Sequence, residues 1–152
     1  MILFLALLIG VVAGYRAMMA PAAVAFAARY HGLNLADTPL AFMGYAWTPW
    51  IFAVAAIGEL VADKLPTTPS RKIPLQFGTR IISGALCGAC IGASDDSLIA
   101  GLIAGIIGAV LGTYGGSAAR AKLAAVFGKD LPGALIEDVV TIVLALVVVF
   151  LV

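Results

Sequence analysis

Residues 98–116 read LIAGLIAGIIGAVLGTYGG, a run without one charged side chain, and the apolar segment continues to residue 127. A helix needs about 20 apolar residues to cross the hydrocarbon core of a bilayer. Glycines recur along this run at spacings of three and four residues, which places them on one face of a helix. Small residues on one face let membrane helices approach closely, so the stretch predicts a membrane helix that packs through its glycines.

The composition of the whole chain also indicates a membrane protein. Of its 152 residues, 63% are hydrophobic and 11% are charged, whereas soluble domains are about 45–50% apolar and about 25% charged. A chain of this size cannot bury so much apolar surface in its own core, so membrane lipids are its expected surroundings and partners. The length allows one polytopic transmembrane domain, residues 1–152. The net charge of +1, without a basic run, argues against a nucleic-acid partner.

Five apolar segments, separated by polar or proline-rich stretches, predict an all-α membrane fold with about five transmembrane helices. They cover residues 2–30, 48–64, 78–94, 98–127 and 133–151. The first segment lacks the basic start of a signal peptide and is expected to be retained. The first and fourth segments are long, and each has a Gly-xxx-Gly pair followed by a polar or Gly-rich stretch. We therefore expect helix breaks at Gly14 and Tyr15, and at Tyr114, Gly115 and Gly116.

These shared features suggest an internal repeat. Segments one and two would form one hairpin and segments four and five a second, with segment three as a linker that inverts the second hairpin. Inverted repeats with interrupted helices are typical of many transporters, and the interruptions tend to mark the binding site. The alternative is that Gly-rich membrane hairpins resemble one another without being repeats.

The distribution of Lys and Arg predicts the orientation. Seven of the nine flank the loops between segments two and three or between four and five: Lys64, Arg71, Lys72, Arg80, Arg120, Lys122 and Lys129. Basic loops stay in the cytoplasm. Five crossings then place the N-terminus in the cytoplasm and the C-terminus outside, in the periplasm if the membrane is a bacterial inner membrane. Trp47 and Trp50 fit an outer aromatic belt.

Charged residues within the segments are the candidate site, because an ionisable group in a membrane is costly and usually faces protein or water. The candidates for transport or ion pairing are Arg16, Glu59, Asp63, Arg80, Glu137 and Asp138. Arg16 keeps its charge, so we expect it to pair with Glu59, Asp63, Glu137 or Asp138. Two interpretations stay open: a path for a proton or cation, and closed ion pairs that fix helix register.

Several stretches, in order, resemble a known family. They are residues 14–23 (GYRAMMAPAA), 59–71 (ELVADKLPTTPSR), 80–86 (RIISGAL), 112–116 (GTYGG) and 135–138 (LIED). Together they resemble a bacterial family of small membrane proteins catalogued as domain of unknown function four-one-two-six. The resemblance implies a bacterial inner-membrane protein over nearly the whole chain, without a reaction or substrate. It assigns these residues to the family pattern: Arg16, Glu59, Asp63, Lys64, Arg71, Arg80, Arg120, Glu137 and Asp138.

Other chemistry has little support in the sequence. Cys87 and Cys90 have the spacing of a redox pair but lie among small residues, where packing is the better interpretation. His31 is the one histidine, so neither a metal site nor a cofactor is expected, and no catalytic motif is present.

Three functions follow from these features. The first is a small transporter or channel for an ion or small solute, coupled to protons or cations through buried carboxylates. The second is a non-catalytic assembly or scaffold protein, and the third is an intramembrane enzyme that modifies a lipid. The Gly stripes predict packing within the chain for the third segment. For the fourth segment they leave open a seam between copies in a homo-oligomer.

Overall fold

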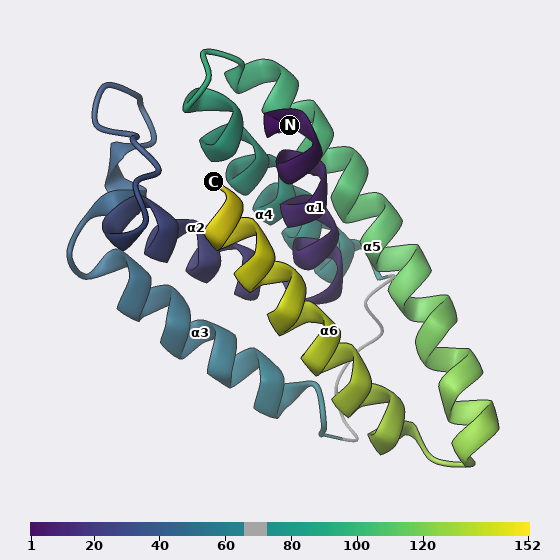
Figure 1. Cartoon of the computed structure of the whole chain (residues 1–152). Coiled ribbons are helices and arrows are strands. Elements are labelled where there is room, and N and C mark those ends of the chain that lie inside the picture. Colours follow the sequence, from purple (N-terminus) through teal and green to yellow (C-terminus); the bar gives the residue numbers. More distant parts are fainter. Residues whose placement is uncertain (66–72) are drawn as a thin grey trace.

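The computed structural model describes residues 1–65 and 73–152, and this part of the chain is all-helical (Figure 1). Its elements are α1 (Ile2–Tyr15), α2 (Met19–Tyr30), the 3-10 helix η1 (Ala41–Gly44), α3 (Thr48–Ala62), α4 (Pro74–Ala93), α5 (Leu98–Phe127) and α6 (Asp130–Leu151). The predicted all-α class is confirmed. By length and composition, α5 and α6 are able to cross a membrane. Arg71 and Lys72, used above for orientation, lie outside the described residues.

Local sequence explains where several helices begin and end. Pro49 and Pro74 lie in the first turns of α3 and α4, where the missing N–H of proline would have no helical partner. Gly128 ends α5 in the left-handed region, at φ +68°, a conformation that glycine adopts without steric cost. The chain can therefore reverse sharply before α6 begins at Asp130.

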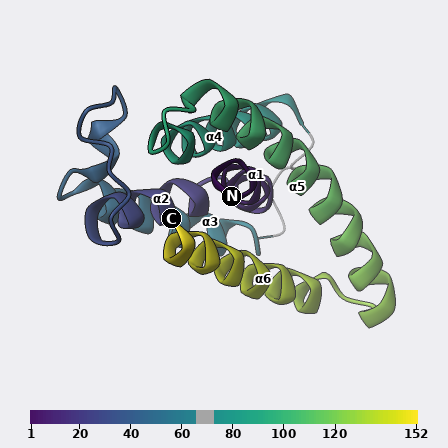
Figure 2. The ribbon, with the colours of Figure 1, turned by 45° about the horizontal axis from the view of Figure 1, so that its top comes forward.

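Helix α1 lies at the centre of the bundle, and Figure 2 shows it almost end-on, between α4, α5 and α6. Glycines make this close packing feasible. A Cβ built on Gly105 would lie 2.0 Å from the carbonyl oxygen of Gly84 on α4, and one on Gly10 would lie 2.3 Å from that of Gly105. The structure thus shows the third segment packing within the chain, as predicted. The α5 glycines from 101 to 112 face α1 and α4, so they are not available as an interface between copies of the chain.

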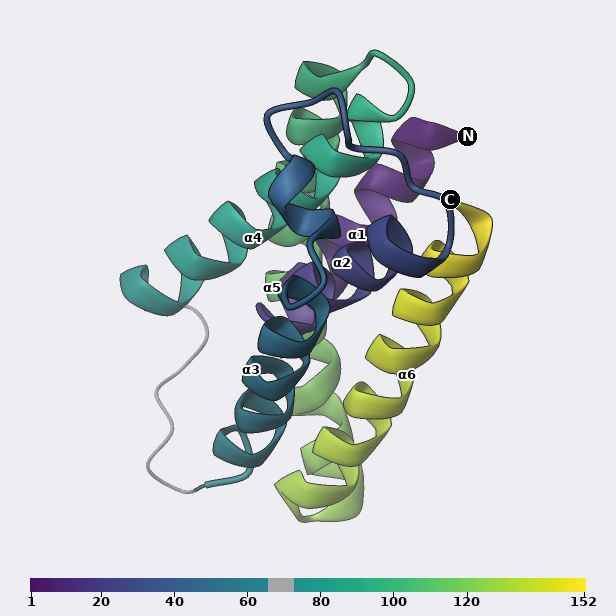
Figure 3. The same cartoon turned by 90° about the vertical axis from the view of Figure 1, so that its left-hand side faces the viewer.

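The first apolar segment is divided into two helices. Helix α1 ends at Tyr15, Arg16 is extended (φ −141°), and α2 begins at Met19. In Figures 1 and 3, α2 turns back from the base of α1 toward the end of the molecule at which the chain begins. With 14 residues, α1 is about 21 Å long at 1.5 Å per residue, which is less than the hydrocarbon thickness of about 30 Å.

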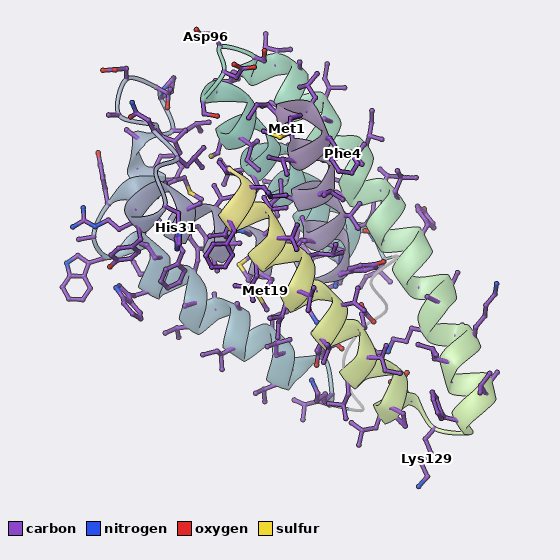
Figure 4. The ribbon with its side chains drawn as sticks, in the orientation of Figure 1. Met1, Phe4, Met19, His31, Asp96 and Lys129 are labelled. Atoms are coloured by element: carbon purple, nitrogen blue, oxygen red, sulfur yellow. The ribbon has the colours of Figure 1, made fainter. Side chains whose placement is uncertain are left out.

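The fold-back brings the two termini to one end of the molecule (Figures 1 and 3). Both termini lie at the same end of the molecule in Figures 1 and 3, near the turn with Asp96, while Lys129 marks the opposite end (Figure 4). Five crossings would place the termini at opposite ends, but residues 2–30, counted above as one crossing, form two helices, α1 and α2. Hydropathy gives the length of an apolar segment but not its direction.

The predicted break in the fourth segment is also wrong. Helix α5 runs without interruption through Tyr114, Gly115 and Gly116. A glycine inside a helix costs only about 1 kcal/mol relative to alanine, and packing offsets it here: Gly112 lies against Val11 of α1, and the Tyr114 ring lies 5.7 Å from that of Phe77. The second hairpin therefore lacks the interruption on which the predicted inverted repeat rested.

The glycine packing predicts a position-specific effect of alanine. Gly105→Ala should destabilise the protein by about 1–3 kcal/mol through overpacking, because the new methyl meets the backbone of α4. Gly115→Ala is the matched control on the same helix, since a Cβ there meets nothing within 4 Å, and it should stabilise by about 0.5–1 kcal/mol. Equilibrium unfolding in detergent micelles measures both. Equal effects of the two substitutions would contradict the packing described here.

Candidate functional site

The candidate site lies at the interruption between α1 and α2. The backbone N–H of Arg16 still closes the last turn of α1 on the carbonyl of Val12, at 2.7 Å, and the chain then leaves the helix. Arg16 itself is completely buried. A buried guanidinium requires compensating negative charge, and its surroundings supply it.

Three carboxylates from two helices surround the Arg16 guanidinium. One terminal nitrogen lies 2.9 Å from Oδ2 of Asp63, and Nε donates to Oδ1 of Asp138 at 3.0 Å. Glu137 lies 3.8 Å away. The other oxygen of Asp138 accepts a hydrogen bond from Lys64. In the structure Arg16 therefore lies beside three of its four predicted partners.

A second guanidinium, Arg120 of α5, extends the network. It lies 2.7 Å from Asp63 and 3.7 Å from Glu137, and it forms a two-pronged contact with Asp130, at 2.9 and 2.6 Å. Asp63 and Glu137 are thus shared between two guanidinium groups. We define the carboxylate network as Arg16, Asp63, Lys64, Arg120, Asp130, Glu137 and Asp138.

Glu59, the fourth candidate partner, has a different role. Its two carboxylate oxygens accept hydrogen bonds from the backbone N–H groups of Ala17 and Met18, at 2.8 and 2.7 Å. These N–H groups precede the first turn of α2, where the helix leaves donors without intrahelical partners and where its dipole favours negative charge. Glu59 therefore caps α2 from a different helix, α3.

Arg80 of α4 satisfies the other side of the interruption. One of its terminal nitrogens donates to the carbonyls of Gly14 and Tyr15, both at 2.7 Å. These carbonyls belong to the last turn of α1, which carries the negative end of that helix dipole. Arg80 also lies 4.0 Å from Glu59. The cation Arg80 therefore faces the C-terminal end of α1, and the anion Glu59 faces the N-terminal end of α2; these are the two half-helix ends of the interruption.

Two members of the network, Arg120 and Asp130, are not among the site residues predicted from the sequence. Arg120 follows Gly112 and Gly116 at a spacing of four residues, so the glycine face that packs against α1 carries it toward the interruption. That spacing was a usable signal. Asp130 gave none, because an acid in the first turn of a helix is explained equally well by capping.

Two of the residues at the predicted helix breaks, Tyr15 and Gly116, lie beside this site. Tyr15 and Gly116 line a cavity of about 80 Å³ together with Arg120 and Glu137. The region of α5 with the predicted break thus does lie beside the interruption of α1, although α5 is continuous. Cys87 and Cys90 are buried, free thiols on α4. Within residues 1–65 and 73–152, no group of three or more His, Cys, Asp or Glu side chains is arranged to hold a metal ion.

The comparison with family models agrees with the resemblance noted in the sequence. Residues 3–151 match the model of DUF4126, a domain of unknown function. The chain belongs to the DUF4126 family. Searches of curated proteins and of solved structures gave no match. The candidate residues of this DUF4126 protein are therefore interpreted from their own geometry.

The network predicts that Arg16 is far more important for folding than an exposed arginine. Arg16→Ala removes the fully buried cation from beside Asp63, Glu137 and Asp138 and leaves these acids only the partly exposed Arg120 and Lys64. Removing one partner of a buried ion pair costs about 3–5 kcal/mol. Arg29, which is exposed, is the control, and Arg29→Ala should change stability by less than about 0.5 kcal/mol. Denaturant unfolding in micelles measures both values. A loss for Arg16→Ala no larger than that for Arg29→Ala would show that the network does not stabilise the fold.

Proposed function

We propose that this protein is a small membrane transporter that moves protons or a small cation through the interruption between α1 and α2. The observation that carries the proposal is the pair of half-helix ends, each facing a charged side chain from another helix. In many transporters a discontinuous helix forms the binding site: its N-terminal end faces an anionic group and its unwound carbonyls face a cation. Here Glu59 and Arg80 occupy those two positions.

Glu59 is the residue proposed to couple protonation to movement. As a carboxylate it holds the Ala17 and Met18 N–H groups through charge-assisted hydrogen bonds, which are roughly twice as strong as neutral ones. Protonation removes the negative charge of Glu59. One of its two oxygens then carries a hydrogen and is a weaker acceptor for a backbone N–H group. The start of α2 is then held less strongly and can separate from α3. Asp138, shared between Arg16 and Lys64, offers the neighbouring carboxylate along the path.

The proposed setting is the inner membrane of a bacterium, with α3 to α6 crossing and α1 and α2 re-entering from one side. Helix α3, with 15 residues, would cross where the bilayer thins locally around a short helix. Four crossings accord with two termini at one end of the molecule (Figures 1 and 3). Lys64, Arg120 and Lys129 belong to the opposite end, near the α5–α6 turn, and basic residues favour the cytoplasmic side. Both termini and the Asp95–Asp96 turn would then be external.

A non-catalytic assembly or scaffold role is the second candidate, and one observation favours it. The charged groups of the carboxylate network have partners from within the chain, as expected for ion pairs that only fix helix register. In that case charge neutralisation would affect stability but move no ion. A flux measurement separates the two functions.

The orientation predicts a labelling pattern for single cysteines. In a Cys87→Ala, Cys90→Ala background, Asp95→Cys should react with a membrane-impermeant maleimide added to intact cells. Lys129→Cys should react only after the membrane is opened, because positive residues are retained inside. Both natural positions are exposed, so accessibility does not limit the reaction. Labelling of both from outside would contradict a crossing by α5, and the reverse pattern would contradict the orientation.

The transport proposal predicts a proton flux that depends on Glu59. Purified protein in liposomes, with a potassium diffusion potential and an internal pH dye, should take up protons faster than protein-free liposomes. Glu59→Gln should lower that rate about tenfold, equivalent to about 1.4 kcal/mol in the barrier. Asp37→Asn, a carboxylate-to-amide change in an exposed loop, should leave it unchanged. Absence of proton, sodium and potassium flux in the folded wild-type protein would reject transport in favour of the scaffold role.

A further inference from the structure

An apolar groove lies apart from the carboxylate network, between α3 and α6, with α2 as its floor. Its volume is about 560 Å³. Alanines make the hollow, because the facing positions on the three helices carry methyl groups in place of larger side chains: Ala22, Ala23, Ala53, Ala56 and Ala145. Tyr30 and His31 lie at one end, where His31 contacts the ring of Phe150 edge-on. Figure 4 shows His31 toward the loop side of the molecule and Met19 nearer its centre.

The groove has the length of one membrane leaflet. On α6 it extends from Ile142 to Phe150, which is about 12 Å at 1.5 Å rise per residue. Half of the hydrocarbon thickness is about 15 Å. Helix α6 is long and apolar enough to cross a membrane. A groove that is open along the side of such a helix would face the lipid tails.

The end of the groove at Tyr30 has the features of a membrane interface. Tyr30 also lines a second pocket, of about 670 Å³, together with Arg29, Asn34 and Tyr45. Tyr30, Tyr45 and Trp50 are all more than half exposed, and aromatic side chains with one polar atom gather at the level of lipid headgroups. Arg29, in the last turn of α2, therefore lies where a phosphate would be.

We propose that this groove binds one anionic phospholipid, with an acyl chain along α6 and its phosphate at Arg29. The two pockets share Tyr30, so one molecule with an apolar tail and an anionic head can fill both. A lipid with its headgroup at the inner end of the groove is unfavourable, because Met19 and Leu60 at that end offer only apolar side chains to a headgroup. The arginine fork matches a phosphate group in geometry and charge. This site does not depend on the transport proposal.

Lipid retention tests the proposal directly. The full-length protein is placed in nanodiscs made of equal parts of phosphatidylglycerol and phosphatidylcholine, extracted into mild detergent, and examined by native mass spectrometry. Wild type should retain one phosphatidylglycerol molecule in preference to phosphatidylcholine. Ala53→Trp, which fills the groove, should lower the retained fraction about tenfold. Arg29→Gln should abolish the preference for the anionic lipid, because it removes the charge and keeps most of the side chain.

Matched variants control for general effects. Ile103→Trp adds the same indole to an exposed position of α5, and Lys122→Gln removes a positive charge from an exposed position near the other end of α5. Both should retain lipid like wild type. Arg29→Gln is a surface change, so it keeps the test decisive if Ala53→Trp fails to fold. Retention by folded Ala53→Trp equal to that of Ile103→Trp, equal retention of the two lipids by wild type, or a dimer without lipid would each overturn the proposal.

Discussion

A guanidinium that cannot lose its charge, placed at a gap in the backbone, constrains the rest of this structure. Arg16 is fully buried and remains positive in any environment that a protein provides. Its charge therefore has to be balanced by carboxylates, and these come from two helices distant in sequence, α3 and α6. The arrangement of α3 and α6 around the base of α1 follows from this requirement as much as from apolar packing, which is weakly directional in lipid.

The gap itself leaves unsatisfied backbone groups, and the bundle supplies partners for them. Inside a membrane each such group costs several kcal/mol. Glu59 accepts from the N–H groups before α2, and Arg80 donates to the carbonyls that end α1. Arg80 can reach them because α4, through Gly84, packs against α5 at backbone distance. The glycine stripes and the charged residues therefore serve one purpose, which is to stabilise the interrupted backbone between α1 and α2.

Part of this was predictable from sequence. Composition alone predicts the helical membrane class, and the cost of an isolated arginine predicts that Arg16 pairs with acids. The role of Glu59 was not predictable, because its partners are backbone N–H groups and leave no trace in side-chain patterns. The break expected at Tyr114 is absent. A glycine destabilises a helix by only about 1 kcal/mol, and the packing of α5 against α1 stabilises the helix by more than that. The fold-back of α2 was missed because its direction is set by long-range contacts.

The two proposed sites share two helices, and this connects them physically. Helix α6 carries Glu137 and Asp138 in the network and, two turns further on, Ala145 in the groove. Helix α2 starts at the N–H groups near Glu59 and forms the floor of the groove along its length. Any movement that frees the start of α2 from Glu59 must change the groove as well. A lipid bound there favours the conformation whose groove it fits, and so it would shift the balance between the closed and open forms of the interruption by its difference in affinity for the two.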